Sequence, residues 1–273
     1  MEFGKLLIIF TFSATFLFNS SIPVIAQEVE DEKEFSYEKD SDVGPEHWGR
    51  IHKEWETCAK GQLQSPIDLS DKRVQVLDNL GDIRHNYKPS NAIMKNRGHD
   101  IMVKWEEGAG GMWLNGTEYI LKQLHWHSPS EHTINGHEYD MELHMVHESK
   151  DKKIAVVGTL YTIGQPDSFL TKMEGYLEEL AGEKGEEVKV GKVNPREVNK
   201  GSRKYYRYMG SLTVPPCTEG VIWTIVDKIR TVSKHQLNLL REAVHDETEI
   251  NARPTQPDND RAIYFYNPRK LKN

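Results

Sequence analysis

The chain has 273 residues with 35 basic and 42 acidic side chains, giving a formal net charge of −7. The two signs are mixed along the chain and no large basic patch is present, which argues against nucleic acid as a partner. A chain of this length can bury a full hydrophobic core without a structural metal, and no Gly/Ser-rich or Pro-rich linker divides it.

The first 26 residues are predicted to be a cleaved secretory signal peptide. Lys5 precedes the apolar run "LLIIFTFSATFLF", and small residues end the segment at Ala26. A membrane anchor is the alternative, but it would need roughly 20 apolar residues in a row. No later stretch is apolar for long enough, so the mature chain is expected to have no membrane span.

A short flexible arm and a single domain are expected after the signal peptide. Residues 27–36 ("QEVEDEKEFS") are mostly acidic and nearly lack aliphatic side chains, as flexible segments do. Residues 37–273 contain no internal repeat and no low-complexity run, so they are assigned to one domain.

Short segments rich in β-branched and aromatic residues recur along this domain, separated by Gly, Asn, Pro and Asp. They include "HDIMVKW" (99–105), "TEYILKQLHWH" (117–127), "HEYDMELHMVH" (137–147), "KIAVVGTLYTIG" (153–164) and "GVIWTIVDKI" (220–229). Their spacing predicts a mainly β protein built on one large, mostly antiparallel sheet.

Two segments have helical periodicity. They are 167–182 ("DSFLTKMEGYLEELAG") and 233–245 ("SKHQLNLLREAVH"), and each begins with a residue that favours the N-cap position, Asp167 or Ser233. The fold is therefore expected to carry a few short helices beside its sheet.

Cysteine and asparagine usage both fit a secreted protein. The chain has two cysteines, Cys58 and Cys217, and an even number in an oxidising compartment predicts one disulfide, with two buried free thiols as the alternative. Asn115-Gly116-Thr117 is an acceptor sequence for N-glycosylation in a stretch that resembles a surface turn.

Histidines are concentrated in "QLHWHSPSEHTINGHEYDMELHMVH", residues 123–147. In a strand alternate residues share a face, so His125 and His127 point the same way and Trp126 points to the other side. Asn135-Gly136 is a strong turn signal that returns the chain, and His144 would then lie on a nearby strand. Three imidazoles can therefore converge on one point.

A catalytic zinc is typically held by three protein ligands, such as three neutral imidazole nitrogens, and its fourth coordination position is left open. A histidine-rich surface strand that binds nothing is the alternative. Metal-bound imidazoles need an acceptor for their second nitrogen, and Gln123 and Glu142 each precede a candidate ligand by two residues. The other histidines of the stretch lack this placement and are interpreted as structural or solvent-facing, namely His132, His137 and His147.

The same stretch resembles the zinc-binding core of the α-class carbonic anhydrases, especially their plant members. Further segments are similar to family signatures in the same order: "GPEHWG" (44–49), "GQLQSPIDL" (61–69), "NRGHDIMVKW" (96–105), "GSLTVPPCTEGVIWTIV" (210–226) and "NARPTQP" (251–257). The resemblance spans about Tyr37 to Tyr266. It implies a large twisted sheet of about ten strands with short peripheral helices.

The resemblance implies zinc-dependent, reversible hydration of carbon dioxide to bicarbonate and a proton. One zinc would be held by His125, His127 and His144, and zinc-bound hydroxide would attack the substrate carbon. By the same resemblance, Thr213 and Glu131 orient the hydroxide. Because a carboxylate can only accept hydrogen bonds, Glu131 fixes the direction of the hydrogen bonds from the hydroxide to Thr213 and from Thr213 to Glu131.

The resemblance also implies roles for residues around the metal. Apolar side chains would form the carbon dioxide recess, with Thr213 and Val214 at the substrate: Val146, Val156, Leu212 and Trp223. His99 matches the proton shuttle, and Asn96 and Tyr37 match residues that order the connecting waters. The resemblance to secreted members of the family also implies a disulfide between Cys58 and Cys217. It further implies cis peptide bonds before Pro66 and Pro216.

Two departures and two other readings remain open. Val214 replaces a second threonine and Met102 replaces a polar side chain on the water path, so the turnover rate is not determined by the resemblance. A storage or binding protein with lost activity is one alternative, since the plant branch includes tuber storage proteins. A zinc-dependent esterase would be a side activity of the same site.

Partners and compartment follow from the same expectations. The partners are small molecules, namely carbon dioxide, bicarbonate and water, and a monomer and a dimer are equally compatible with the sequence. A signal peptide places the chain in the secretory pathway, which would lead to secretion into the extracellular space or, in a plant, onward to the chloroplast stroma.

Overall fold

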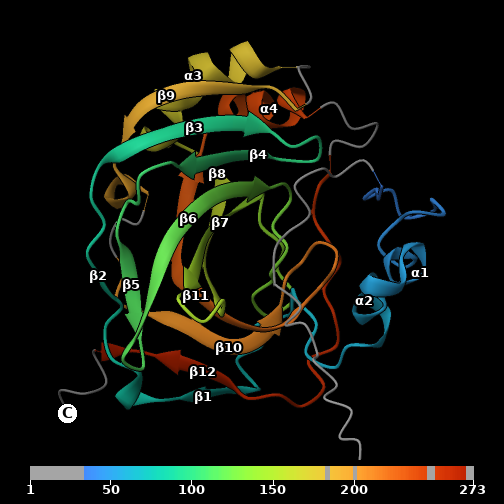
Figure 1. The fold of residues 1–273 in the computed structure, drawn as a ribbon. Coiled ribbons are helices and arrows are strands. Elements are labelled where there is room, and N and C mark those ends of the chain that lie inside the picture. The colour runs from blue at the N-terminus through green and yellow to red at the C-terminus, as the bar shows by residue number, and fades with distance from the viewer. Residues whose placement is uncertain (1–33, 182–184, 199–201, 245–249, 269–273) are drawn as a thin grey trace, which may run out of the picture.

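A computed structural model describes residues 34–181, 185–198, 202–244 and 250–268 of the chain. Within this part the protein is mainly β, with one large, strongly twisted sheet and short helices at its periphery (Figure 1). The predicted signal peptide and most of the predicted arm, residues 1–33, lie outside the described residues. No helix in the described ranges is long and apolar enough to cross a membrane.

The strands are β1 Val74–Val76, β2 Arg84–His85, β3 Ser90–Asn96, β4 Ile101–Trp105, β5 Gly111–Leu114, β6 Thr117–His127, β7 Met141–Ser149, β8 Ile154–Ile163, β9 Glu187–Val193, β10 Tyr205–Ser211, β11 Glu219–Val232 and β12 Ile263–Tyr266. The helices are α1 Trp48–Ile51, α2 Thr57–Lys60, α3 Ser168–Leu180 and α4 Lys234–Ala243, with 3₁₀ turns at Lys53–Trp55, Asp78–Leu80 and Pro195–Glu197.

Ten strands follow one path through the sheet, in the order β1-β12-β10-β11-β8-β7-β6-β4-β3-β9, and β2 and β5 extend it beside β6. Most neighbouring strands are antiparallel, and the described parallel pairs are β1 with β12 and β8 with β11. The predicted large and mostly antiparallel sheet is confirmed. The strands β2 and β5, which lie off this path, bring the described total to twelve, slightly above the predicted ten.

Apolar side chains cover both faces of the central strands, because residues alternate between the two faces. On β7, Leu143 and Met145 belong to a cluster between the sheet and helices α3 and α4. Val146 on the same strand belongs to a second cluster on the opposite face. The central strands are therefore buried on both sides, and any polar residue there needs a partner.

Both long helices begin where the sequence predicts. The Asp167 carboxylate accepts hydrogen bonds from the backbone N–H groups of Phe169 and Leu170 at the start of α3. Ser233 caps α4 in a reciprocal arrangement with Gln236. Figure 1 shows α3 and α4 together at the end of the sheet formed by β3, β4 and β9.

The packed part of the chain begins at a lower residue number than expected. Phe35, which the sequence placed in the flexible arm, is only 3% exposed and packs edge-on against Trp48 at a ring distance of 5.0 Å. Its aromatic ring buries enough apolar area to hold this segment against α1, which a purely acidic segment would not do. The packed region therefore includes Phe35.

The predicted disulfide is present between Cys58 in α2 and Cys217, with sulfur atoms 2.05 Å apart. The peptide bonds before Pro66 and Pro216 are cis, as the resemblance implies, and the Ser128-Pro129 bond is cis as well. Asn135 and Gly136 have φ values of 52° and 75°, which confirms a tight turn between β6 and β7.

Candidate metal centre

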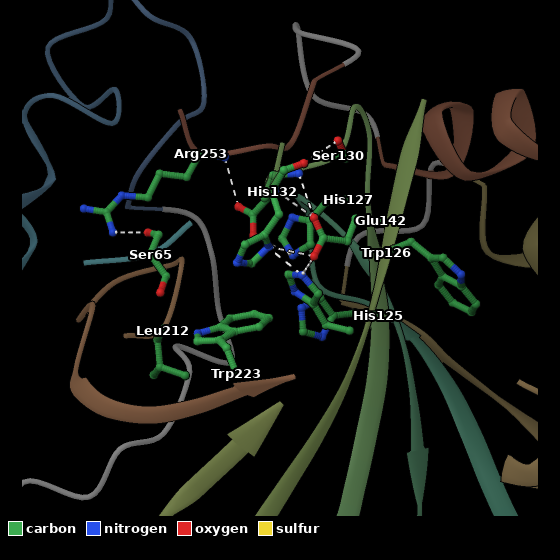
Figure 2. Close-up of polar contacts among 12 residues, drawn as sticks. Ser65, His125, Trp126, His127, Ser130, His132, Glu142, Leu212, Trp223 and Arg253 are labelled. Carbon is green, nitrogen blue, oxygen red and sulfur yellow. Dashed lines mark hydrogen bonds and ion pairs between the residues drawn. The ribbon is translucent and has the colours of Figure 1, made fainter. Parts of the chain in front are cut away.

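Adjacent strands bring three histidines together. His125 and His127 lie on β6, and the antiparallel register places His125 directly opposite His144 on β7. Their ligating ring nitrogens all lie within 4.8 Å of one another, and each side chain is at most 3% exposed. Figure 2 shows His125 and His127 on one side of β6, with Trp126 on the other, as the strand alternation predicts.

A hydrogen-bond acceptor holds one nitrogen of each ring. His125 Nδ1 donates to Gln123 Oε1 at 2.8 Å, and His144 Nε2 donates to Glu142 Oε1 at 2.9 Å. His127 Nδ1 donates to the backbone oxygen of Asn251 at 2.7 Å. These oxygens can only accept, so each bonded nitrogen carries the proton and the other nitrogen keeps its lone pair.

The three lone pairs fit a tetrahedral cation. The nitrogens left over are Nε2 of His125, Nε2 of His127 and Nδ1 of His144, a donor set that suits zinc with a fourth position open. His127 Nε2 is buried and has no hydrogen-bond partner in the part of the chain that the structure describes. Because buried polar atoms normally have partners, this nitrogen fits a metal ligand.

The protonation state of His125 suits a metal ligand. Burial, followed by the charge of Arg97 and of the neighbouring imidazoles, holds the pKa of His125 well below its ordinary value of 6.5. The ring is therefore neutral at physiological pH. A neutral imidazole is the form that ligates zinc.

Glu142 connects the metal centre to a deeper network. Its Oε1 also accepts from His132 Nδ1 at 2.8 Å, and its Oε2 accepts from the backbone N–H groups of Glu131 and His132. Burial opposes its ionisation, but His132 and His144 hold the pKa of the Glu142 carboxyl well below its usual range. These hydrogen bonds explain why His132, Glu142 and His144 also lie close enough together to hold a cation.

A glycine makes room for this carboxylate. Gly158 on β8 lies opposite His144 in the strand pairing. A Cβ atom at this position would approach Glu142 Oε1 to 2.8 Å and the Ile225 side chain to 2.5 Å. Any larger residue would push Glu142 away from His144, so the acceptor of the third ligand depends on this glycine.

Thr213 and Glu131 lie together at the metal centre. The Glu131 side chain is fully buried, and its Oε2 lies 3.7 Å from His127 Nε2. Burial raises the pKa of the Glu131 carboxyl, and the charge of His127 and hydrogen bonding with Thr213 act in the opposite direction. A metal cation at the three histidines would further favour the carboxylate form.

The predicted substrate recess is one apolar cluster beside the metal centre. Val146, Val156, Leu212 and Trp223 all belong to the cluster on the histidine face of the sheet, and each is at most 7% exposed. The Trp223 ring lies 4.8 Å from the His144 ring, and its Nε1 donates to Ser211 O. Val214 packs separately, around the disulfide.

The predicted proton shuttle lies beneath the N-terminal segment. His99 is 5% exposed, its Nε2 is 2.7 Å from the backbone oxygen of Phe35, and the Tyr37 ring packs edge-on at 5.5 Å. Asn96 is also buried, and its amide nitrogen donates to the backbone oxygens of Leu180 and Ala243. The structure thus places Asn96 at the ends of α3 and α4, and its role toward water stays a prediction.

Sequence reasoning assigned no role to Asn251 and Arg253, although both lie in the quoted segment 251–257. Asn251 bonds His127 through its backbone oxygen, and its side chain bonds the backbone of Trp126, Ser128 and His99. Arg253 donates its backbone N–H to Glu131 Oε1 at 3.0 Å. The signal available in the sequence was the pair of polar residues in a segment otherwise typical of a loop.

The Arg253 side chain ties this loop to the N-terminal region. Its guanidinium group donates to Gln64 Oε1, to the backbone oxygen of Ser65 and to the backbone oxygen of Cys58, and it is 2% exposed. Burial lowers the pKa of Arg253 to about 10, partly offset by Glu131. The group that positions Glu131 is therefore anchored beside the disulfide, as Figure 2 shows for the Arg253 and Ser65 contact.

Comparisons with known proteins identify the family of this chain. The chain is 55% identical to "Alpha carbonic anhydrase 7" of Arabidopsis thaliana over 88% of both chains. Its fold matches a dioscorin crystal structure in complex with ascorbate, with a TM-score of 0.83, 45% identity, and coverage of 85% of this chain and 98% of that one. A hyperthermostable carbonic anhydrase from a hydrothermal vent chimney gives a TM-score of 0.77 and 36% identity over 85% of this chain and all of that one. The profile of the eukaryotic-type carbonic anhydrases matches residues 43–267. The chain therefore belongs to the family of eukaryotic-type carbonic anhydrases.

Proposed function

We propose that this carbonic anhydrase hydrates carbon dioxide reversibly at one zinc ion held by His125, His127 and His144. The observation that carries the proposal is the convergence of three ring lone pairs, each aimed by an acceptor on the other nitrogen. Zinc bound there would lower the pKa of a coordinated water toward neutrality and supply the nucleophile for carbon dioxide.

Thr213 and Glu131 orient the attacking group in this proposal. Glu131 is held by the Arg253 backbone N–H, and Thr213 lies close enough to its carboxyl to lower the carboxyl pKa. An ionised carboxylate accepts a hydrogen bond from the Thr213 hydroxyl, which leaves the Thr213 oxygen to accept a hydrogen bond from the nucleophile. The lone pair of the nucleophile then faces the apolar recess formed by Val146, Val156, Leu212 and Trp223, where carbon dioxide binds.

His99 removes the proton released in each turnover. It is the proposed shuttle because an imidazole can both accept and donate a proton and because its ring lies beside Tyr37. Replacing His99 by alanine should slow turnover in weak buffer, and added imidazole should restore the rate. Unchanged turnover in weak buffer would remove His99 from the mechanism.

The central experiment is zinc analysis together with stopped-flow hydration of carbon dioxide. The purified mature chain should hold one zinc and hydrate carbon dioxide far above the buffer rate. His144→Ala should lose both, and His137→Ala, at an exposed position, should keep both. Absence of zinc, or hydration no faster than buffer, would instead favour the storage alternative.

Secretion and glycosylation complete the proposal. The disulfide between Cys58 and Cys217 supports passage through an oxidising compartment. We propose that residues 1–26 are removed as a signal peptide and that Asn115 carries an N-linked glycan. Mass spectrometry of the protein from a secretory host reports both the new N-terminus and the occupancy of Asn115.

A further inference from the structure

The N-glycosylation acceptor lies in a rigid two-residue turn. Asn115 and Gly116 connect β5 to β6 with φ values of 49° and 80°, the left-handed conformation that a tight hairpin turn requires. Asn115, Gly116 and Thr117 are all exposed. The attachment point is therefore held by the sheet at a defined place, which removes much of the entropy lost when a mobile loop is ordered.

A groove of about 540 Å³ begins at this turn. Asn115 itself lines it, together with the β7–β8 turn at Lys152 and Lys153 and the beginning of β11. Its lining mixes polar and apolar side chains, and the apolar ones include Tyr119, which belongs to the buried core between the sheet and α3 and α4. These segments thus enclose a space beside the Asn115 acceptor.

Met209 is exposed in this groove to an unusual degree. It is 44% exposed and is one of four large apolar side chains with such exposure in the described part of the chain. It pairs directly with Ile222 across β10 and β11, and both side chains line the groove. An apolar patch of this kind beside a fixed attachment point is suited to the apolar face of a sugar ring.

We propose that this groove seats the first N-acetylglucosamine of a glycan on Asn115, with the sugar ring packed over Met209 and Ile222. The proposal rests on the glycosylation of Asn115 proposed above and adds where the sugar lies. The short covalent link delivers the sugar to the groove, and Lys153 at the rim offers an ammonium donor to its oxygen atoms.

The seat is far from the metal centre. Thr117 begins β6 and His125 lies eight residues further along the same strand, roughly 26 Å at the usual rise of a strand. A sugar in the groove should therefore leave carbon dioxide hydration unchanged. Activity serves as a control for correct folding, and the readout must be local.

Oxidation of Met209 provides that readout, because the rate of sulfoxide formation follows exposure of the sulfur. The chain is produced in a secretory host that adds high-mannose glycans, and Asn115 occupancy is measured by mass spectrometry. Thr117→Ser keeps the acceptor sequence, whereas Thr117→Ala abolishes it without changing the turn residues Asn115 and Gly116. Each protein is treated with dilute hydrogen peroxide, before and after endoglycosidase H trims the glycan to a single sugar.

Met209 should oxidise several-fold more slowly in the wild-type and Thr117→Ser proteins than in Thr117→Ala, and trimming to one sugar should preserve the protection. Equal oxidation despite an occupied Asn115 would overturn the seat and leave glycosylation standing. Protection lost on trimming would assign the shielding to outer sugars and likewise overturn the seat. An unoccupied Asn115 would overturn both proposals, and the occupancy measurement separates that case from the others.

Discussion

The Glu142 carboxylate accepts a hydrogen bond from His144 Nε2 at 2.9 Å and, through the same oxygen, from His132 Nδ1 at 2.8 Å. His132 Nε2 in turn lies 2.7 Å from the Tyr208 hydroxyl. One side of the metal centre is therefore held by a chain of buried groups. The orientation of His144 therefore depends on residues outside the group of three histidines.

Replacing Glu142 by glutamine should weaken zinc binding by about 10- to 100-fold, the usual effect of losing a partner of a metal ligand. The amide cannot accept from His144 as strongly, and its NH₂ group would face backbone N–H donors. Competition with a chelator measures the affinity. Glu138→Gln, at an exposed position in the same connection, is the matched control. Equal zinc affinity in wild type and Glu142→Gln would contradict the proposed role.

Replacing Arg253 by methionine should lower the free energy of unfolding by about 3 kcal/mol or more. The change leaves the acceptors on Gln64, Ser65 and Cys58 buried without their donor, and each such group costs about 1–3 kcal/mol. Urea unfolding measures the loss. Arg203→Met removes a solvent-exposed ion pair with Asp82 and should cost at most about 1 kcal/mol.

The same Arg253→Met variant should hydrate carbon dioxide more slowly while retaining zinc. Its backbone N–H positions Glu131, so a local shift at Arg253 would misplace Glu131 and Thr213, whereas His125 and His144 keep their acceptors on β6 and β7. Stopped-flow turnover and zinc content, measured on folded protein, separate the two effects. Zinc loss in parallel with activity would mean that Arg253 acts on the whole site.

Removing the disulfide should destabilise the protein by up to about 5 kcal/mol, since the bond closes 159 residues of chain and restricts the unfolded state accordingly. The test is the Cys58→Ser, Cys217→Ser double variant in urea unfolding. The loop after Thr213 also has backbone bonds, Cys217 N–H to Val214 O and Leu212 N–H to Thr218 O. Zinc binding by folded protein should therefore survive. Unfolding free energies equal to those of the wild type would refute the prediction.

His147 should make the protein less stable in acid. Burial lowers its pKa to about 4, from an ordinary 6.5, and its Nε2 bonds the Tyr87 hydroxyl at 2.7 Å. Between pH 6.5 and 4, His147 is protonated in the unfolded chain but neutral in the folded chain. Its contribution to the free energy of unfolding is therefore complete above pH 6.5 and decreases as the pH falls toward 4. The loss integrates to about 3 kcal/mol.

A His147→Gln variant should lack this part of the acid sensitivity. From pH 7.5 to 4 the wild type should lose up to about 3 kcal/mol more unfolding free energy than the variant. The carboxylates titrate in both proteins, so their effect cancels in this comparison. Urea unfolding at several pH values measures the curves. His137→Gln, at an exposed position, should run parallel to wild type, and a parallel curve for His147→Gln would rule out the effect.

The local order of the site was predictable from the sequence. Strand alternation determined that His125 and His127 share a face opposite Trp126, and the pairing of β6 with β7 needed little more than the turn at Asn135 and Gly136. Gln123 and Glu142 were predictable as acceptors for the same reason, since each lies two residues before its histidine. Those relations depend on the period of a single strand.

Only the tertiary structure decided which distant groups complete the site. Asn251 reaches His127 across 124 residues, and Arg253 reaches Glu131 across 122. The burial of His132 and the packing of Phe35 over His99 likewise follow from how separate segments fill a shared space. A strand pattern specifies the direction of a side chain, but close packing of the whole chain selects the partner that side chain meets.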